Sequence, residues 1–127
     1  MQARVLGMIV LAFLAGCATQ PGRQIQDFFA PSKGQAALDA GVKQYEDGDY
    51  ADSSRSLAAA LDQGLNERGQ VRARKYLAFI SCASNRIAAC REEFRKALAI
   101  DPSFELAPAE AGHPIWGPVF RQLKSGR

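Results

Sequence analysis

Residues 70–100 read QVRARKYLAFISCASNRIAACREEFRKALAI, which is two amphipathic segments joined by a short turn. Their larger apolar residues recur at helical spacing. These residues are Val71, Tyr76, Leu77, Phe79 and Ile80, then Ile87, Phe94, Ala97, Leu98 and Ile100. Asn85 tolerates the left-handed backbone of a tight turn, and Asp101-Pro102 ends the second segment because proline cannot continue a helix. The pattern predicts helices over 70–84 and 87–100.

The same unit is present upstream. From Gln35 the residues Leu38, Val42 and Tyr45 recur at i, i+4 and i+7, and Asp47-Gly48-Asp49 then breaks the run. A second helical stripe carries Leu57, Ala60 and Leu61 and ends at Asp62-Gln63-Gly64. Gly48 and Asn85 take equivalent turn positions, 37 residues apart. Since no alternating run is long enough for a strand, we expect an all-α fold with two helical hairpins.

The segment 103–127 differs from both units. Residues 107–114 are rich in turn formers, and Trp116, Val119 or Phe120, and Leu123 then follow at helical spacing. Pro118 requires that this helix begin close to it or that its first turn be irregular. We expect a capping helix over the open side of the second hairpin, because a single hairpin cannot bury its apolar face alone. His113 is expected to fix the preceding turn or to cap this helix.

The N-terminus has the build of a secretory signal. One charge, Arg4, precedes an apolar run from Val5 to Ala15, which is too short for a permanent transmembrane helix. Leu14-Ala15-Gly16-Cys17 resembles the bacterial lipobox, in which cleavage before the cysteine leaves it as a lipidated N-terminus. Residues 1–16 would then be absent from the mature protein, and 17–34 would form a lipidated tether. Ordinary cleavage after Ala18, which would release a free protein, is the alternative.

The charge is unevenly distributed. The whole chain carries 16 basic and 13 acidic residues. Residues 17–65 hold four basic and seven acidic groups, whereas residues 66–127 hold eleven and six. A basic C-terminal half could dock an acidic partner or face an anionic surface, although solvated helix faces also explain most such charges. An exported chain makes nucleic acid an improbable ligand.

Cys82 and Cys90 remain as an even pair once Cys17 is lipidated, and an oxidising compartment favours their pairing. One lies near the end of a helix and the other about one turn into the next, so a disulfide can form across the turn. We expect a structural disulfide. Two reduced core thiols and a redox role are alternatives, the latter weakened because the pair lacks the Cys-x-x-Cys spacing.

Residues 34–102 resemble the tetratricopeptide (TPR) repeat. The positions that carry this resemblance are Leu77, Ala78, Cys90, Phe94, Ala97 and Pro102 in the second copy, and Gly41, Ser53, Leu57 and Ala60 in the first. Both copies depart from the pattern at the tryptophan position, which Ala37 and Arg74 occupy. The resemblance implies a short α-solenoid with two TPR-like hairpins over 35–102 and a capping segment over 103–127; a generic pair of helical hairpins is the alternative.

By the same resemblance, the first helix of each unit lines a concave surface that binds peptides or partner helices. Carried onto this sequence, that predicted groove consists of Leu38, Val42, Tyr45, Arg72, Lys75 and Phe79. Its apolar half next to a basic half suits an amphipathic or acidic segment. The alternative is that Phe28-Phe29 of the tether, or the C-terminal helix, covers these residues.

The expected function is binding rather than catalysis. The chain has no Ser-His-Asp context, P-loop or dinucleotide motif, and a lone histidine makes a poor metal site, so we expect no catalytic residue, metal or cofactor. The carboxylate pairs Glu92-Glu93 and Asp47/Asp49 are expected to face solvent. The resemblance implies a lipoprotein on the periplasmic face of the bacterial outer membrane. It would act as a scaffold or assembly factor for an envelope machine such as type VI secretion or a type IV pilus. An adaptor for peptidoglycan enzymes, or a thiol redox protein, is the alternative, and the oligomeric state is open.

Overall fold

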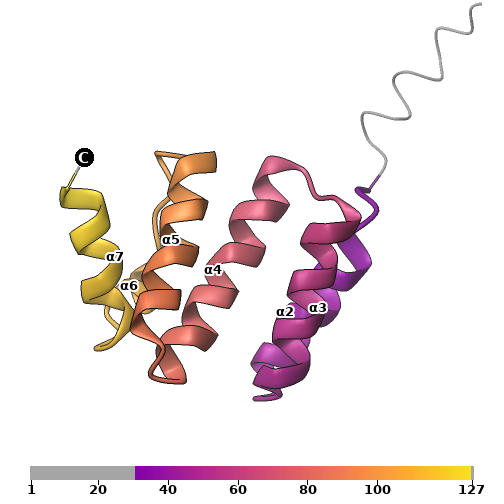
Figure 1. Ribbon diagram of the computed structural model, residues 1–127, viewed down its shortest axis with the longest axis horizontal. Helices are drawn as coiled ribbons and strands as arrows, with labels where there is room; N and C mark the ends of the chain where they lie inside the picture. The colour runs from indigo at the N-terminus through magenta and orange to yellow at the C-terminus, as the bar shows by residue number, and fades with distance from the viewer. Residues whose placement is uncertain (1–30, 127) are drawn as a thin grey trace, which may run out of the picture. The chain divides into compact units, whose positions relative to one another are not determined.

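The computed structural model describes residues 31–126, and the expectations for the leader, Cys17 and the tether up to Ala30 lie outside that range. Six helices pack together in the described part (Figure 1). They are α2 (Gln35–Glu46), α3 (Tyr50–Gln63), α4 (Glu67–Ala83), α5 (Ile87–Ile100), α6 (Pro108–Ala111) and α7 (Trp116–Ser125). No strand occurs among residues 31–126, so the predicted all-α class is confirmed for them.

The helices follow one another across the described part in nearly the order of the sequence. Figure 1 shows α2 and α3 together, α4 beside α5 in the middle, and α6 and α7 on the far side of α5. Helix α4 contacts α2, α3, α5 and α7 and is therefore the central element. These four neighbours cover much of the surface of α4.

Two turns of the same geometry join α2 to α3 and α4 to α5. Gly48 and Asn85 adopt the left-handed backbone conformation in these turns, with φ values of 84° and 60°. In each turn two backbone N–H groups donate back to the preceding helix in the Schellman pattern. These bonds are Gly48 to Tyr45 (3.0 Å) and Asp49 to Gln44 (2.8 Å), then Asn85 to Cys82 (3.1 Å) and Arg86 to Ser81 (2.8 Å). The two turns, which lie 37 residues apart in the sequence, therefore also share a backbone hydrogen-bond pattern.

Small residues bring paired helices close together. The buried hydroxyl of Ser53 on α3 donates a 2.7 Å hydrogen bond to the carbonyl of Gly41 on α2. A Cβ at Gly41 would lie 2.8 Å from the side chain of Leu57, so a larger residue there would force the helices apart. In the second pair Ala78 and Cys90 are fully buried.

Two local features differ from the sequence expectations, and a third, the position of Pro118, agrees with them. Helix α4 begins at Glu67 rather than residue 70, because the Asn66 side chain accepts a 2.8 Å hydrogen bond from the Gly69 N–H and caps it. The short helix α6 lies within the expected turn region. Pro118 is the third residue of α7, where a missing N–H leaves no hydrogen bond unmade.

Aromatic side chains connect two hydrophobic clusters. The first cluster lies between α2, α3 and α4 and contains Leu38, Val42, Leu57, Ala60, Leu65, Ala73 and Ile80. The second extends from α4 to α7 and contains Ala78, Phe79, Cys82, Cys90, Phe94, Leu98, Leu106, Trp116, Val119 and Phe120. Tyr45 and Tyr76 pack against both clusters, so the described helices share one continuous interior.

Gly34, the last residue before α2, is part of the packed fold. The Gly34 N–H donates a 2.9 Å hydrogen bond to the Gly64 carbonyl, and Gly34 is buried. The sequence expectation placed this residue in the tether. Close packing against the end of α3 explains the difference, because a Cβ at Gly34 would overlap the carbonyl oxygen of Ala60.

Replacing Gly34 by alanine should therefore destabilise the fold. We expect Gly34→Ala to lower the free energy of unfolding by about 1–3 kcal/mol through this overlap. Gly112→Ala is the matched control, because Gly112 has a similar backbone (φ −78° against −82°) and its nearest neighbour would lie 3.8 Å from the new Cβ. Urea unfolding followed by circular dichroism measures both variants. Equal stability of the two would contradict the close contact.

Candidate functional site

Three residues of the predicted groove are interior residues. Leu38, Val42 and Phe79 expose 1%, 5% and 1% of their surface. They cannot contact a partner in the folded protein, so their assignment to a binding surface is wrong. The reason is that the apolar stripe that marks each segment as a helix is the stripe by which that helix packs.

The C-terminal helix covers the part of α4 around Phe79. Trp116 of α7 stacks on the Phe79 ring, with centroids 4.3 Å apart and planes tilted by 23°. His113 stacks in turn on Trp116 at 3.3 Å, and the Trp116 indole N–H donates to the Glu110 carbonyl at 2.9 Å. The C-terminal helix therefore covers Phe79, which was one of the alternatives that the sequence left open.

Lys75 is already paired within the chain. Its ammonium Nζ lies 2.9 Å from Oε2 of Glu110 on α6, and the two side chains expose 17% and 21% of their surface. The same ammonium lies 4.8 Å from the centroid of the Tyr76 ring. Glu110 also accepts a hydrogen bond from the Ala107 N–H at 2.9 Å, which fixes its carboxylate. Lys75 therefore holds α6 against α4 and is not a free cation.

Tyr45 occupies a partly buried aromatic cluster. Its ring centroid lies 4.9 Å from that of Tyr76 and 5.4 Å from that of Tyr50. Burial raises the pKa of Tyr45 to about 12, and the neighbouring Tyr50, Tyr76 and Glu110 add to the shift because each opposes a phenolate charge. Tyr45 therefore stays a neutral phenol throughout the physiological range.

Arg72 is the one predicted groove residue that the structure leaves well exposed. Its side chain exposes 46% of its surface, and its guanidinium lies 3.8 Å from the Asp39 carboxylate, at the limit of an ion pair. An exposed pair of this length contributes little stability. The Arg72 guanidinium can therefore turn to another carboxylate at little cost.

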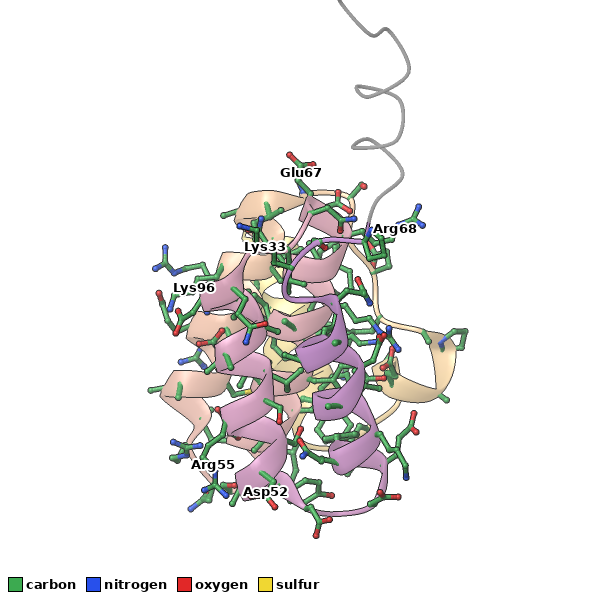
Figure 2. The ribbon with its side chains drawn as sticks, turned by 90° about the vertical axis from the view of Figure 1, so that its right-hand side faces the viewer. Lys33, Asp52, Arg55, Glu67, Arg68 and Lys96 are labelled. Atoms are coloured by element: carbon green, nitrogen blue, oxygen red, sulfur yellow. A yellow bond between two sulfur atoms is a disulfide. The ribbon has the colours of Figure 1, made fainter. Side chains whose placement is uncertain are left out.

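A pocket of about 400 Å³ lies beside Arg72, where the first half of α4 faces the chain that leaves α5. We call it the α4 pocket; it is lined by Glu67, Arg68, Val71, Arg72, Lys75, Ile100, Asp101 and Phe104. Its volume lies within the range of small-ligand pockets. Figure 2 shows Glu67 and Arg68 at one end of the molecule and Lys96 on the opposite side from Arg68.

Of these lining residues, only Arg72 and Lys75 were predicted from the sequence to belong to a binding surface. The helical spacing of Arg68 and Arg72, four residues apart, could have added Arg68. Phe104 could not have been found in this way, because it follows Pro102 in an irregular segment. Its return to α4 depends on the Asp101 turn, in which the Phe104 N–H donates to the Asp101 carbonyl at 3.1 Å.

The structure joins Cys82 and Cys90 in a disulfide, with their Cα atoms 5.1 Å apart. The two residues expose 1% and 0% of their surface. A thiolate must reach one of the sulfur atoms before it can exchange with a disulfide. This burial favours the structural interpretation of the pair over the redox alternative.

Other candidate groups take part in local contacts. His113 Nδ1 accepts a 3.2 Å hydrogen bond from the Ile115 N–H, as expected for a residue that fixes this turn. Glu93 does not face solvent freely as predicted, because it pairs with Arg74 at 3.0 Å and exposes only 18% of its side chain. Glu92 pairs with Arg95 at 2.6 Å on the exposed surface of α5.

Residues 31–126 provide neither a cluster of metal ligands nor a membrane-spanning helix. No group of three or more histidine, cysteine or acidic side chains in this range is arranged to hold a metal ion. No helix in the same range is long and apolar enough to cross a membrane.

Comparison with known proteins adds no assignment to this geometry. No family model matches the chain, and neither the curated proteins nor the solved structures contain a match.

The buried disulfide should resist mild reductants. In a Cys17→Ser background, we expect no alkylation of Cys82 or Cys90 after the folded protein is incubated with glutathione, and full alkylation after reduction in denaturant. Replacing both cysteines by serine should lower the free energy of unfolding by about 2–3 kcal/mol, because the link closes a loop of 8 residues. Reversible opening of the folded protein by glutathione would instead support the redox alternative.

The raised pKa of Tyr45 predicts a loss of stability in alkali. Between the ordinary tyrosine pKa of 10 and about 12, the unfolded chain loses a proton that the folded chain keeps. Stability should therefore fall as pH rises through this interval. Tyr45→Phe should remove a phenolate absorbance step near pH 12 and make the decline shallower. An unchanged absorbance titration in Tyr45→Phe would contradict this interpretation.

Proposed function

We propose that this chain is a non-enzymatic lipoprotein of the bacterial envelope that binds another protein on the exposed face of α4. The observation that carries this proposal is the α4 pocket, which combines an apolar base with the accessible guanidiniums of Arg68 and Arg72. Around it, the neighbouring surface of α4 is closed by the Lys75–Glu110 pair and by Trp116. The remaining open surface has the mixed character of a peptide-binding site.

The two helical pairs support a TPR-like interpretation of the fold. The turns at Gly48 and Asn85 share a positive φ and the same pair of backbone hydrogen bonds. Small buried residues lie in both pairs: Gly41 and Ser53, which share a hydrogen bond, in the first, and Ala78 and Cys90 in the second. In such a short α-solenoid, α7 would be the capping helix and α2 and α4 the first helices of the two units.

The envelope location rests on the N-terminal sequence. The apolar run before Leu14-Ala15-Gly16-Cys17 supports export and lipidation. The Cys82–Cys90 disulfide agrees with an oxidising compartment such as the periplasm. By family resemblance, Ala18 after the lipidated cysteine favours the periplasmic face of the outer membrane.

The partner is proposed by class only. An envelope machine such as a type VI secretion system or a type IV pilus would use the chain as an assembly factor. An adaptor for peptidoglycan enzymes is the second candidate, since it needs the same anchor and the same binding surface. Both candidates require a protein at the α4 face.

Site-specific photocrosslinking in cells tests this function. A benzoylphenylalanine residue replaces Arg72 in one strain and Arg91, an exposed arginine on α5, in another. We expect the probe at position 72, but not at position 91, to capture a discrete protein in the membrane fraction. The second probe controls for collisions at the membrane surface. The absence of a captured protein at position 72, or the same products at both positions, would contradict the proposed function.

A further inference from the structure

We propose that the α4 pocket binds an acidic peptide segment of the partner, with one aromatic or large aliphatic side chain in the pocket and carboxylates on Arg68 and Arg72. This inference rests on the proposed function, because it specifies what the bound protein presents. It follows from three properties of the pocket: its base, its accessible cations and its acidic groups.

The base of the pocket is apolar. Val71 on α4 exposes 7% of its surface, and Ile100 and Phe104 on the opposite wall are half-buried. These three side chains line a pocket of about 400 Å³. A bound apolar side chain would remove their exposed surface from water, which is the favourable term that such a pocket offers.

Two guanidiniums border the pocket without a close acidic partner. Arg68 makes no ion pair with any residue between 31 and 126, and the one partner of Arg72, Asp39, lies 3.8 Å away. The two arginines are four residues apart on α4 and therefore lie on the same face of the helix. A guanidinium binds a carboxylate through two parallel hydrogen bonds. Neighbouring acidic residues of a peptide would provide that pair of carboxylates.

The remaining lining charges restrict the occupant further. Lys75 is satisfied by Glu110, and Asp101 accepts hydrogen bonds from the Ser103 hydroxyl (2.6 Å) and N–H (3.0 Å), which lower the pKa of its carboxyl group. Glu67 and Asp101 add two acidic side chains to the lining of the pocket. A ligand with anionic groups throughout would meet repulsion there. A peptide limits this repulsion because only some of its groups are anionic, so its carboxylates can bind Arg68 and Arg72 while its neutral side chain enters the pocket.

Fluorescence anisotropy with a labelled peptide tests this assignment on the full lipoprotein in nanodiscs of phosphatidylcholine. The probe is the blocked pentapeptide acetyl-DEFED-amide carrying a fluorophore. We expect saturable binding, and at least tenfold weaker binding of two control peptides. One of these replaces the acidic residues by their amides, and the other replaces phenylalanine by alanine.

Variants of the protein locate the binding. Arg68→Glu/Arg72→Glu should weaken binding of the acidic peptide at least tenfold. Arg86→Glu/Arg91→Glu, which changes the net charge equally at exposed positions in the second turn and on α5, should change it less than twofold. The pocket variant should also gain binding of the basic peptide acetyl-KKFKK-amide. Far-ultraviolet circular dichroism of both variants checks that they remain folded.

Three results would overturn the inference. They are the absence of saturable binding at millimolar peptide, equal loss in both arginine variants, and displacement of the peptide by phosphatidylglycerol vesicles from the wild type alone. The last result would assign the pocket to lipid headgroups. Capture of a protein by the probe at position 72 would still support the proposed function in each case, so the two failures are distinguishable.

Discussion

The packing around Phe79 is the constraint on which the rest of this structure depends. Its buried ring contacts Tyr76 on α4, Phe94 on α5 and Trp116 on α7, with centroids 5.8, 6.0 and 4.3 Å away. Tyr45 extends these contacts to α2 at 6.1 Å. Aromatic pairs at such distances add to the free energy of burial. One residue thereby joins both helical pairs to the C-terminal segment, which otherwise shares few contacts with the N-terminal pair.

This packing also determines which part of α4 stays exposed. Trp116 lies on Phe79, and the short helix α6, which precedes Trp116 in the sequence, places Glu110 beside Lys75 of α4. The second half of α4 is then closed, and its first half, with Arg68 and Arg72, remains open beside Phe104. The proposed binding arginines and the aromatic interior therefore lie on different parts of the same helix. A partner bound as proposed would contact Arg68 and Arg72 without displacing Phe79 or Trp116.

Much of this arrangement could be predicted from sequence, because local signals determine it. Helices begin or end beside three signals in the sequence, which are Gly48, Asn85 and Asp101-Pro102. The spacing of Cys82 and Cys90 around one turn, together with the export signal, favoured the pairing that the structure shows. Local signals do not say which side of a helix its neighbours cover. For that reason Leu38, Val42 and Phe79 were assigned to a surface, and the contribution of Phe104, which depends on long-range packing, was missed.

The claim that the C-terminal segment is part of the central packing has one direct test. Trp116 is the only tryptophan of the chain, so its fluorescence reports α7 alone, whereas far-ultraviolet circular dichroism reports every helix. Urea unfolding should give the same midpoint and the same m-value by both probes, because a shared core unfolds as one cooperative unit. A fluorescence transition at lower urea than the loss of helix would show that α7 detaches independently, and would contradict the central role of Phe79.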